Sequence, residues 1–315
     1  MGQDFKHAVV TGGAGFIGSH LVERLIKDCL DVTVIDDLST GNANNLLLSN
    51  KAKTKFIKAD ITDPKACNNA LKGAEVVFHQ AAVSSVTSSF KDPRRTTAVN
   101  IGGTLNLLES SRLNNVEALI FASSAAVYGD SHPPCREKSC PKPLTPYAVT
   151  KLAAENLCHV YNELYGLKTI ILRYFNVYGP RQRSDLEGGV IAQFLTRLRE
   201  GRGPVIFGDG SNTRDFIHVQ DVVEANILGA ITPLKYGVFN IGTGKPTKIL
   251  DLANLLSSLT GRRLQPEFTS PRYGDVKDSW CDTSRAYQIL HFSAKINLTH
   301  GLKSLLDTLF AGSKK

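Results

Sequence analysis

Short runs of hydrophobic residues alternate with amphipathic stretches over the first 172 residues of the chain. Each run is continuously apolar rather than alternating, which is typical of strands that are covered on both faces of a sheet. The runs expected to form strands are His7–Thr11, Val32–Asp36, Lys55–Asp60, Val76–His79, Ala118–Ser123 and Thr169–Arg173. Helical patterns separate most of them, so the order predicts an α/β fold with a doubly wound parallel sheet.

The pattern changes after Arg173, where the loops become longer and richer in Gly and Pro. Phe239–Ile241 is expected to form one further short strand. Helices are predicted over Ile191–Glu200, Gln220–Ile231, Leu250–Leu259 and Leu302–Phe310. No repeat or low-complexity linker interrupts the chain, so we expect a smaller lobe that packs tightly over the carboxyl edge of the sheet.

The clearest local motif is a glycine-rich turn, TGGAGFIG at residues 11–18. It follows the first strand and opens a helix predicted over Phe16–Lys27, which is the setting of a dinucleotide-binding turn. Gly12 permits the tight turn, Gly15 lets the backbone approach a pyrophosphate, and Gly18 allows the helix to pack closely on the strand. The amides and the dipole of the helix N-terminus would stabilise the phosphate charge. The alternative is a glycine-rich loop without a ligand.

Two acidic residues at strand ends bear on the choice of dinucleotide. Asp36 ends the second strand, 18 residues after Gly18, where a carboxylate binds the adenosine ribose hydroxyls. The 2′-phosphate of NADP would lie next to the negative charge of Asp36, and this repulsion would cost ~4 kcal/mol of binding free energy. We therefore expect NAD rather than NADP. Asp60 and Ile61 are expected to border the adenine, although Asp60 equally suits the N-cap of a helix near Pro64.

A tyrosine and a lysine lie four residues apart at the start of a later helix. Thr145 suits the N-cap and Pro146 the first helical position, so Tyr147 and Lys151 share one helix face. A tyrosine is a poor base at neutral pH, and lowering its pKa by ~3 units requires ~4 kcal/mol. A buried ammonium one turn away and a cationic nicotinamide ring are expected to supply it. By itself, a tyrosine four residues before a lysine more often indicates a surface tyrosine that packs on the aliphatic part of the lysine side chain.

Ser123 and Ser124 end the fifth strand, at the edge of a parallel sheet where ligands bind. Either hydroxyl is placed to bond a substrate oxygen that is being oxidised. The alternative is a serine that caps a turn at the end of the strand.

Composition excludes several other classes of protein. The 315 residues are 42% hydrophobic and 21% charged, which excludes a disordered or fibrous chain. No apolar run approaches the ~18 residues of a membrane span, and no signal peptide is recognisable, so a cytoplasmic protein is expected. Six cysteines without a C-x-x-C pair indicate reduced thiols, and no metal site is expected.

A net charge of +8 suits an acidic partner. Without a module of basic and aromatic residues, however, we expect no nucleic acid partner.

Together, these motifs resemble the extended short-chain dehydrogenases/reductases, and within them the UDP-galactose and UDP-N-acetylglucosamine 4-epimerases. The resemblance runs from about residue 6 to about residue 310. It includes the glycine turn, HQAA at 79–82, SSAAVYG at 123–129, the Y-x-x-x-K pair, RYFNVYGPR at 173–181 and RDFIHV at 214–219. It implies a Rossmann-like NAD-binding domain over 1–173, with residues 215–245 returning to the sheet, and an interleaved sugar-nucleotide lobe over 174–315.

The resemblance also implies roles at matching positions. Ser124 would bond the sugar hydroxyl, Tyr147 would be the base, and Lys151 would hold the cofactor ribose and tune the tyrosine. The residues implied to line the cofactor are Gly12, Gly15, Phe16, Ile17, Asp36, Asp60, Ile61, Ala81, Ala82, Tyr147 and Lys151. Those implied to bind substrate are Ser124, Tyr147, Asn176, Arg214, Arg272, Asp275 and Ser279. Two separated arginines suit a diphosphate because each offers forked donors, although either alone also suits a surface ion pair.

The implied reaction is the epimerisation of UDP-hexoses at C4 through a transient 4-keto sugar, with tightly bound NAD. Ala125 and Ala126 stand where related dehydratases carry an Asp-Glu pair, so dehydration is disfavoured. Epimerisation or decarboxylation of UDP-glucuronate remains an alternative because it too begins with oxidation at C4. A non-catalytic NAD-binding sensor on the same fold is a distant alternative.

The resemblance further bears on the sugar and on assembly. In the epimerases, a position seven residues beyond a phosphate-binding arginine limits the space beside the sugar C2 substituent, and here it is Ser279, counted from Arg272. A serine leaves room for an N-acetyl group, so UDP-GlcNAc and UDP-GalNAc are expected substrates beside UDP-Glc and UDP-Gal. A homodimer is implied through the helices around Thr104–Arg112 and Ala148–Leu164.

Overall fold

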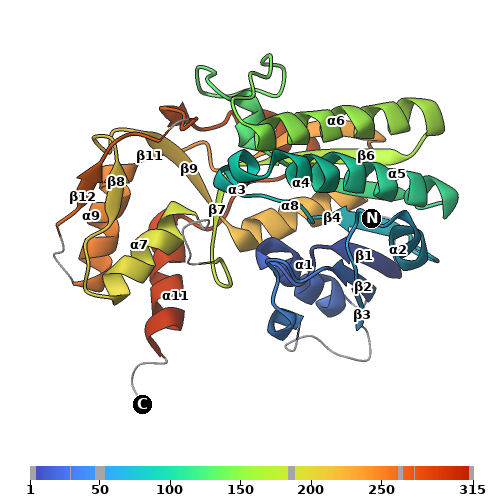
Figure 1. Ribbon diagram of the computed structural model, residues 1–315, viewed down its shortest axis with the longest axis horizontal. Coiled ribbons are helices and arrows are strands. Elements are labelled where there is room, and N and C mark those ends of the chain that lie inside the picture. The colour runs from blue at the N-terminus through green and yellow to red at the C-terminus, as the bar shows by residue number, and fades with distance from the viewer. Residues whose placement is uncertain are drawn as a thin grey trace.

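The larger of two lobes is built on a seven-stranded sheet, to the right in Figure 1. The computed structural model describes residues 5–28, 30–46, 54–183, 189–261, 265–272 and 274–311. The strand order is β3-β2-β1-β4-β5-β6-β10, and every neighbouring pair is parallel. The strands are β1 (His7–Thr11), β2 (Asp31–Asp36), β3 (Thr54–Lys58), β4 (Val76–His79), β5 (Ala118–Ser124), β6 (Lys168–Tyr174) and β10 (Tyr236–Ile241). The predicted doubly wound parallel sheet is therefore confirmed.

Helices cover both faces of this sheet. One face carries α1 (Phe16–Lys27), α8 (Val219–Ile231) and α10 (Ser284–Leu290). The other carries α2 (Pro64–Ala70), α5 (Thr104–Leu113) and α6 (Pro146–Tyr165). Along β1, Ala8 and Val10 pack into the first layer and Val9 into the second, which explains why the run is continuously apolar. Before α5 lie α3 (Val86–Lys91), α4 (Pro93–Thr97) and a π-helical segment, η3 (Ala98–Gly103).

The smaller lobe, to the left in Figure 1, brings together strands that lie far apart in the chain. Its main sheet joins β7 (Asn176–Tyr178), β9 (Thr213–His218), β11 (Pro246–Lys248) and β13 (Asp278–Ser279), and β8 (Val205–Phe207) pairs with β12 (Glu267–Thr269). The helices are α7 (Val190–Arg199), α9 (Ile249–Thr260) and α11 (Leu298–Ala311). Phe194, Leu252 and Leu302 lie in the core that these elements share. Two 3-10 turns, η1 (Ala43–Leu46) and η4 (Ala125–Tyr128), complete the described elements of the protein.

The prediction that every strand is covered on both faces was wrong for the third one. Strand β3 is the last of the sheet, and Lys55, Phe56 and Lys58 are exposed on it. An edge strand lacks a neighbour on one side, and lysines there hinder pairing with another chain. The two lysines of β3 are therefore a signal of an edge strand that the prediction did not use.

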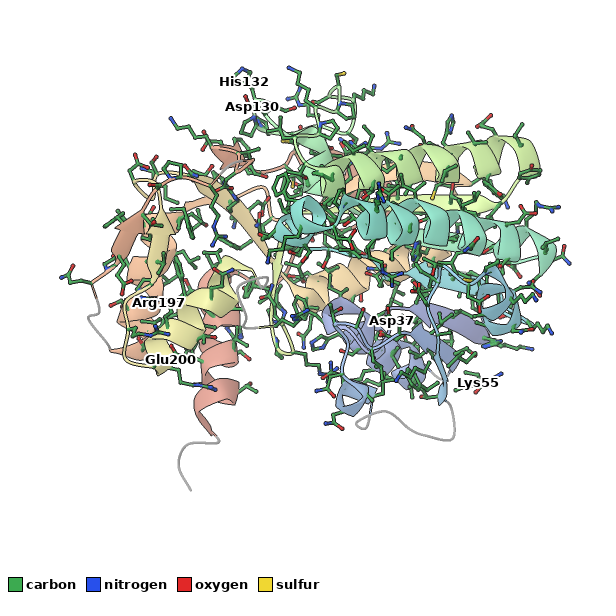
Figure 2. The ribbon with its side chains drawn as sticks, in the orientation of Figure 1. Asp37, Lys55, Asp130, His132, Arg197 and Glu200 are labelled. Atoms are coloured by element: carbon green, nitrogen blue, oxygen red, sulfur yellow. The ribbon has the colours of Figure 1, made fainter. Side chains whose placement is uncertain are left out.

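Charged side chains cover the outer surfaces of both lobes (Figure 2). Near the end of α7, Arg197 pairs with Glu267, and just after the helix Arg202 pairs with Glu200. These pairs offset part of the local positive charge. Within the described part of the chain, no helix combines the length and the apolar character needed to cross a membrane. The five described cysteines are free thiols, whereas Cys29 lies outside the described residues.

Candidate active site

The glycine-rich turn has the close approaches that its sequence predicts. Gly12 has a φ of 65°, and a Cβ atom there would lie 2.8 Å from the backbone nitrogen of Ala81. A Cβ atom at Gly18 would lie 2.2 Å from the carbonyl oxygen of Gly12. Gly15 is the N-cap of α1 and has no side chain to cap it, so the first amides of the helix remain available to an anion.

Asp36 places a buried carboxylate at the end of β2, beside this turn. Its Oδ2 atom accepts a hydrogen bond from the Ala14 amide at 3.0 Å, and its Oδ1 atom accepts one from the Leu38 amide at 2.8 Å. Burial raises the pKa of this carboxyl, and the two amides oppose the rise. The glycine turn is shaped for a pyrophosphate, and the adjacent carboxylate of Asp36 suits a ribose. Together they fit an NAD molecule.

Three further side chains meet where β5 and α6 come together. Thr145 caps α6 by accepting a hydrogen bond from the Ala148 amide at 3.1 Å, which sets Tyr147 and Lys151 on one face of the helix. Ser124, the last residue of β5, accepts a hydrogen bond from the Ala126 amide at 3.1 Å, and its side chain interacts with Tyr147 and acts to lower the pKa of the tyrosine. The serine and the tyrosine are thus held together at the carboxyl edge of the sheet.

The expected effect of Lys151 on Tyr147 is not found in the protein alone. Burial raises the pKa of Tyr147, and only the bond from Ser124 opposes this rise. The ammonium of Lys151 donates to the carbonyl of Ala122 at 2.8 Å and lies 6.0 Å from the centroid of the Tyr147 ring. Burial also lowers the pKa of Lys151 itself to about 8. Sequence spacing correctly puts the pair on one helix face, but it does not show that the lysine is directed to a strand carbonyl.

The two arginines expected to bind a diphosphate lie on the smaller lobe, and one of them is paired with Asp275. Arg214, buried on β9, forms an ion pair with Asp275 and also donates to the carbonyls of Thr213 and Val276 at 2.7 and 2.8 Å. Arg272 lies over the ring of Phe207 at 3.5 Å, and burial lowers its pKa. Ser279 lies opposite Arg214 in the register of the parallel strands β13 and β9.

One cleft of about 2060 Å³ lies between the turn, the α6 helix and the smaller lobe. All of the predicted cofactor and substrate residues line it, including Phe16, Ile17, Ile61, Ala82 and Asn176. Pockets for single ligands commonly measure about 300–1,000 Å³, so this cleft has room for two ligands. Among the described residues, no cluster of His, Cys, Asp or Glu side chains is arranged to hold a metal ion.

Several residues of the cleft lining were missed at the sequence level, and three of the charged ones are Asp37, Arg95 and Arg183. Asp37 follows Asp36 directly, Arg95 lies on α4, and Arg183 follows β7. Asp37 could have been found from the doubled aspartate at a strand end. Arg95 offers no comparable signal, because Arg94-Arg95 in the sequence looks like any exposed basic helix turn.

A glycine turn on a parallel sheet, together with Ser124, Tyr147 and Lys151, defines a dinucleotide-binding enzyme of the short-chain dehydrogenase/reductase class. A sequence model of the NAD dependent epimerase/dehydratase family matches residues 8–242. The chain belongs to this family, whose cofactor is NAD.

Similar proteins act on different sugars. The UDP-glucose 4-epimerase of Thermotoga maritima, solved with UDP-glucose, is 39% identical, with a TM-score of 0.93 over 98% of this chain and 100% of that chain. The UDP-N-acetylglucosamine 4-epimerase of Methanobrevibacter ruminantium is 36% identical, with the same TM-score and coverage. A UDP-glucuronate 4-epimerase of Thermodesulfobacterium geofontis is 35% identical over 95% of this chain and 94% of its own length.

Proposed function

We propose that this protein is a UDP-hexose 4-epimerase that interconverts UDP-Glc with UDP-Gal and UDP-GlcNAc with UDP-GalNAc. The observation that carries the proposal is one large cleft whose lining includes Ser124 and Tyr147 together with the dinucleotide turn and the arginines of the smaller lobe. Such a cleft brings a sugar carbon between a cofactor and a base. Ala125 and Ala126 also lie on this cleft, and they provide no acid for an elimination.

The proposed chemistry assigns one task to each residue. Tyr147 takes the proton from the 4-hydroxyl of the sugar, and Ser124, beside Tyr147 on the cleft, orients that oxygen. Arg272 and Arg214 anchor the diphosphate, and Arg214 does so by exchanging Asp275 for a phosphate oxygen. When bound, NAD supplies the removal of a hydride from C4 and its return to the opposite face. Tyr147 then returns the proton to the sugar oxygen.

Incubation with UDP-Glc, UDP-GlcNAc and UDP-GlcA in turn, with products resolved by NMR, tests this proposal. We expect the C4 epimer of the first two sugars without consumption of added NAD, because the reaction has no net redox change. A requirement for stoichiometric NAD, or turnover of UDP-GlcA alone, would contradict the proposal.

A second candidate substrate is UDP-glucuronate, and Arg183 is the observation that favours it. This arginine, which follows β7 in the chain, is one of the residues that line the cleft, and a cation in the lining suits the carboxylate of a uronic acid. In the same NMR experiment, this candidate predicts UDP-galacturonate when epimerisation occurs and a UDP-pentose when decarboxylation follows oxidation.

Ser279 provides a test of the proposed tolerance for N-acetyl sugars. In Ser279→Tyr, we expect turnover of UDP-GlcNAc to fall by more than about tenfold relative to UDP-Glc, because a bulky ring fills space beside the sugar. The ratio of kcat/KM values for the two sugars is the measurement. Ser279→Ala is the control and should leave that ratio unchanged. An unchanged ratio in the tyrosine variant as well would show that this position does not control the C2 substituent.

We also propose that the protein forms a homodimer through α5 and α6, which lie side by side on the larger lobe (Figure 1). Large apolar side chains are exposed on this pair of helices: Leu105, Leu113, Val149, Val160, Leu164 and Tyr165. Leu164 is 68% exposed, and several large apolar side chains exposed on neighbouring helices are typical of an interface.

The mass in solution tests the dimer. By sedimentation at micromolar concentration we expect twice the chain mass of 34.3 kDa, and the mass of the single chain for Leu164→Glu. The control is Tyr287→Glu on α10, which is 65% exposed outside this patch and should leave the dimer intact. A wild-type protein that sediments as a monomer would contradict the proposal.

A further inference from the structure

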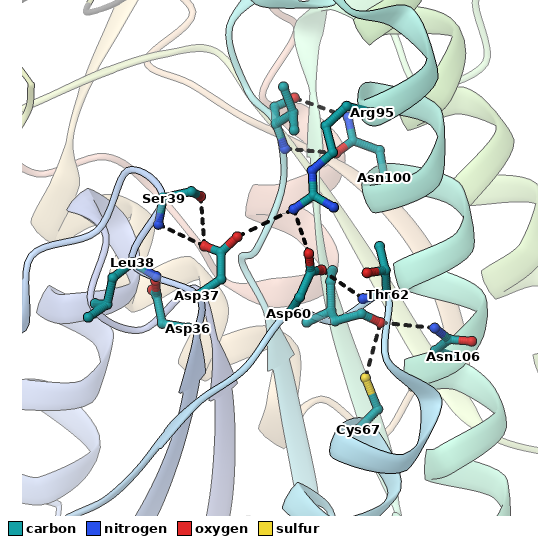
Figure 3. Close-up of polar contacts among 12 residues, drawn as sticks. Asp36, Asp37, Leu38, Ser39, Asp60, Thr62, Cys67, Arg95, Asn100 and Asn106 are labelled. Atoms are coloured by element: carbon teal, nitrogen blue, oxygen red, sulfur yellow. Dashed lines mark hydrogen bonds and ion pairs between the residues drawn. The ribbon is translucent and has the colours of Figure 1, made fainter.

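Arg95 joins two carboxylates at the adenosine end of the cleft (Figure 3). Its Nη2 atom lies 2.5 Å from Oδ2 of Asp60 and 3.4 Å from Oδ2 of Asp37. All three residues line the cleft. Asp37 follows β2 and Asp60 follows β3, whereas Arg95 comes from α4, beyond the fourth strand. The guanidinium therefore connects segments on opposite sides of the opening where the ribose and adenine are expected to bind.

The helix that carries Arg95 is firmly held. The side chain of Asp92 caps α4 by accepting a hydrogen bond from the Arg95 amide at 2.9 Å. In the π-helical segment that follows, Asn100 bonds both backbone groups of Val83 at 2.8 and 3.1 Å and the Thr150 hydroxyl at 3.0 Å. The backbone next to Arg95 is thus hydrogen-bonded to the loop after β4 and to α6. Because this backbone is already ordered, little further mobility is lost when the guanidinium binds the two carboxylates.

Both acidic partners are also oriented by local bonds. Oδ1 of Asp37 accepts bonds from the amide and hydroxyl of Ser39 at 2.9 and 2.6 Å, which leaves Oδ2 for Arg95. Oδ1 of Asp60 accepts a bond from the Thr62 amide at 2.8 Å. Burial by itself would raise the pKa of Asp60, but the Thr62 amide and Arg95 outweigh it and lower this pKa.

The adenine side of the opening is fixed as well. The carbonyl of Ile61 accepts bonds from Asn106 at 2.9 Å and from the thiol of Cys67 at 3.2 Å. Figure 3 shows that the contacts to Asn106 and Cys67 lie beside the Asp60–Arg95–Asp37 pairs, near the ends of β2 and β3. The side chains of Arg95, Asp37 and Asp60 are 42%, 32% and 30% exposed, so the pairs remain accessible to salt.

We propose that Arg95 is a cofactor-retaining residue, whose pairs with Asp37 and Asp60 close the adenosine end of the cleft and slow the release of NAD. The inference depends only on the dinucleotide binding at this site and not on the sugar that is turned over. If Arg95 does not slow the release of NAD, the proposed epimerase reaction is unaffected. If the protein does not catalyse that reaction, the effect of Arg95 on NAD release can still be measured in the same way.

The test measures the rate at which NAD leaves the loaded protein. The protein is saturated with NAD and freed of excess, and released NAD is captured by an added alcohol dehydrogenase with ethanol and read as NADH absorbance. We expect Arg95→Gln to release NAD about tenfold faster at low salt, and Arg95→Lys to fall between this variant and wild type. Arg94→Gln is the matched control, because it removes an equal charge from an exposed position on the same helix, and it should leave the rate unchanged.

Two further readouts separate ion-pair closure from a general structural effect. Wild-type release should accelerate as NaCl is raised to 0.5 M, whereas release from Arg95→Gln should change little, because exposed pairs are screened by salt. Asp37→Asn should also accelerate release, and the double variant should be no faster than Arg95→Gln alone, because both changes break the same unit. Release from Arg95→Gln within twofold of wild type at low salt would overturn the proposal, as would equal salt dependence in both proteins.

Discussion

Replacing Tyr147 with phenylalanine is expected to lower kcat for UDP-sugar epimerisation by about 10³-fold, while the protein keeps its NAD. The reason is that proton transfer by a positioned side chain contributes typically about 10²–10⁴-fold to a rate. Tyr147 is buried and lines the cleft beside Ser124, so removing its hydroxyl oxygen removes the base and leaves the ring in place. The measurement is turnover of the best UDP-sugar substrate, together with the NAD content of the denatured protein.

Tyr161→Phe provides the matched control for this change. Tyr161 lies on the same helix and is similarly buried, but its hydroxyl donates to Glu109 on α5 at 2.8 Å, away from the cleft. This variant should keep activity within about twofold of wild type. Residual activity above one tenth in Tyr147→Phe would show that another group acts as the base.

The second large effect is expected on stability, from a buried ion pair behind the catalytic residues. Glu155, two turns beyond Tyr147 on α6, contacts Arg173 on β6 through bonds of 2.6 and 2.9 Å, and both side chains are 5% exposed. The glutamate also accepts a bond from Ser123, and the arginine lies 4.8 Å from the centroid of the Tyr128 ring. Glu155→Gln leaves the Arg173 charge buried without its counterion. We therefore expect a loss of about 3–5 kcal/mol in the free energy of unfolding.

Unfolding in urea, with and without the change, measures this loss. Glu200→Gln is the control, because Glu200 pairs with Arg202 on the surface, where the side chains are 44% and 58% exposed. Exposed pairs contribute at most about 1 kcal/mol, so this variant should unfold close to wild type. The double change Glu155→Leu with Arg173→Met should recover part of the stability, because it removes both charges. A loss below about 1 kcal/mol in Glu155→Gln would mean that Arg173 finds another partner or water.

The elements of the larger lobe were largely predictable because each is specified by neighbouring residues. The structure confirms β1 and α1 at the predicted residues and extends the fifth and sixth strands by only one or two. The cap at Thr145 and the stop at Gly166 of α6 also follow from local backbone preferences, since Gly166 has a φ of 68°. Short strands of two or three residues, such as β8 and β13, show no such pattern and were not predicted.

What the sequence alone determined is the chemistry of single segments: a parallel α/β fold, a glycine turn suited to NAD, and a tyrosine and lysine on one helix face. These follow from residue types within a few positions of one another. The tertiary structure decided which segments meet. It paired Arg214 with Asp275, and joined Arg95 to Asp37 and Asp60. Such contacts depend on how distant strands are ordered in space, and no local pattern of side chains encodes that order.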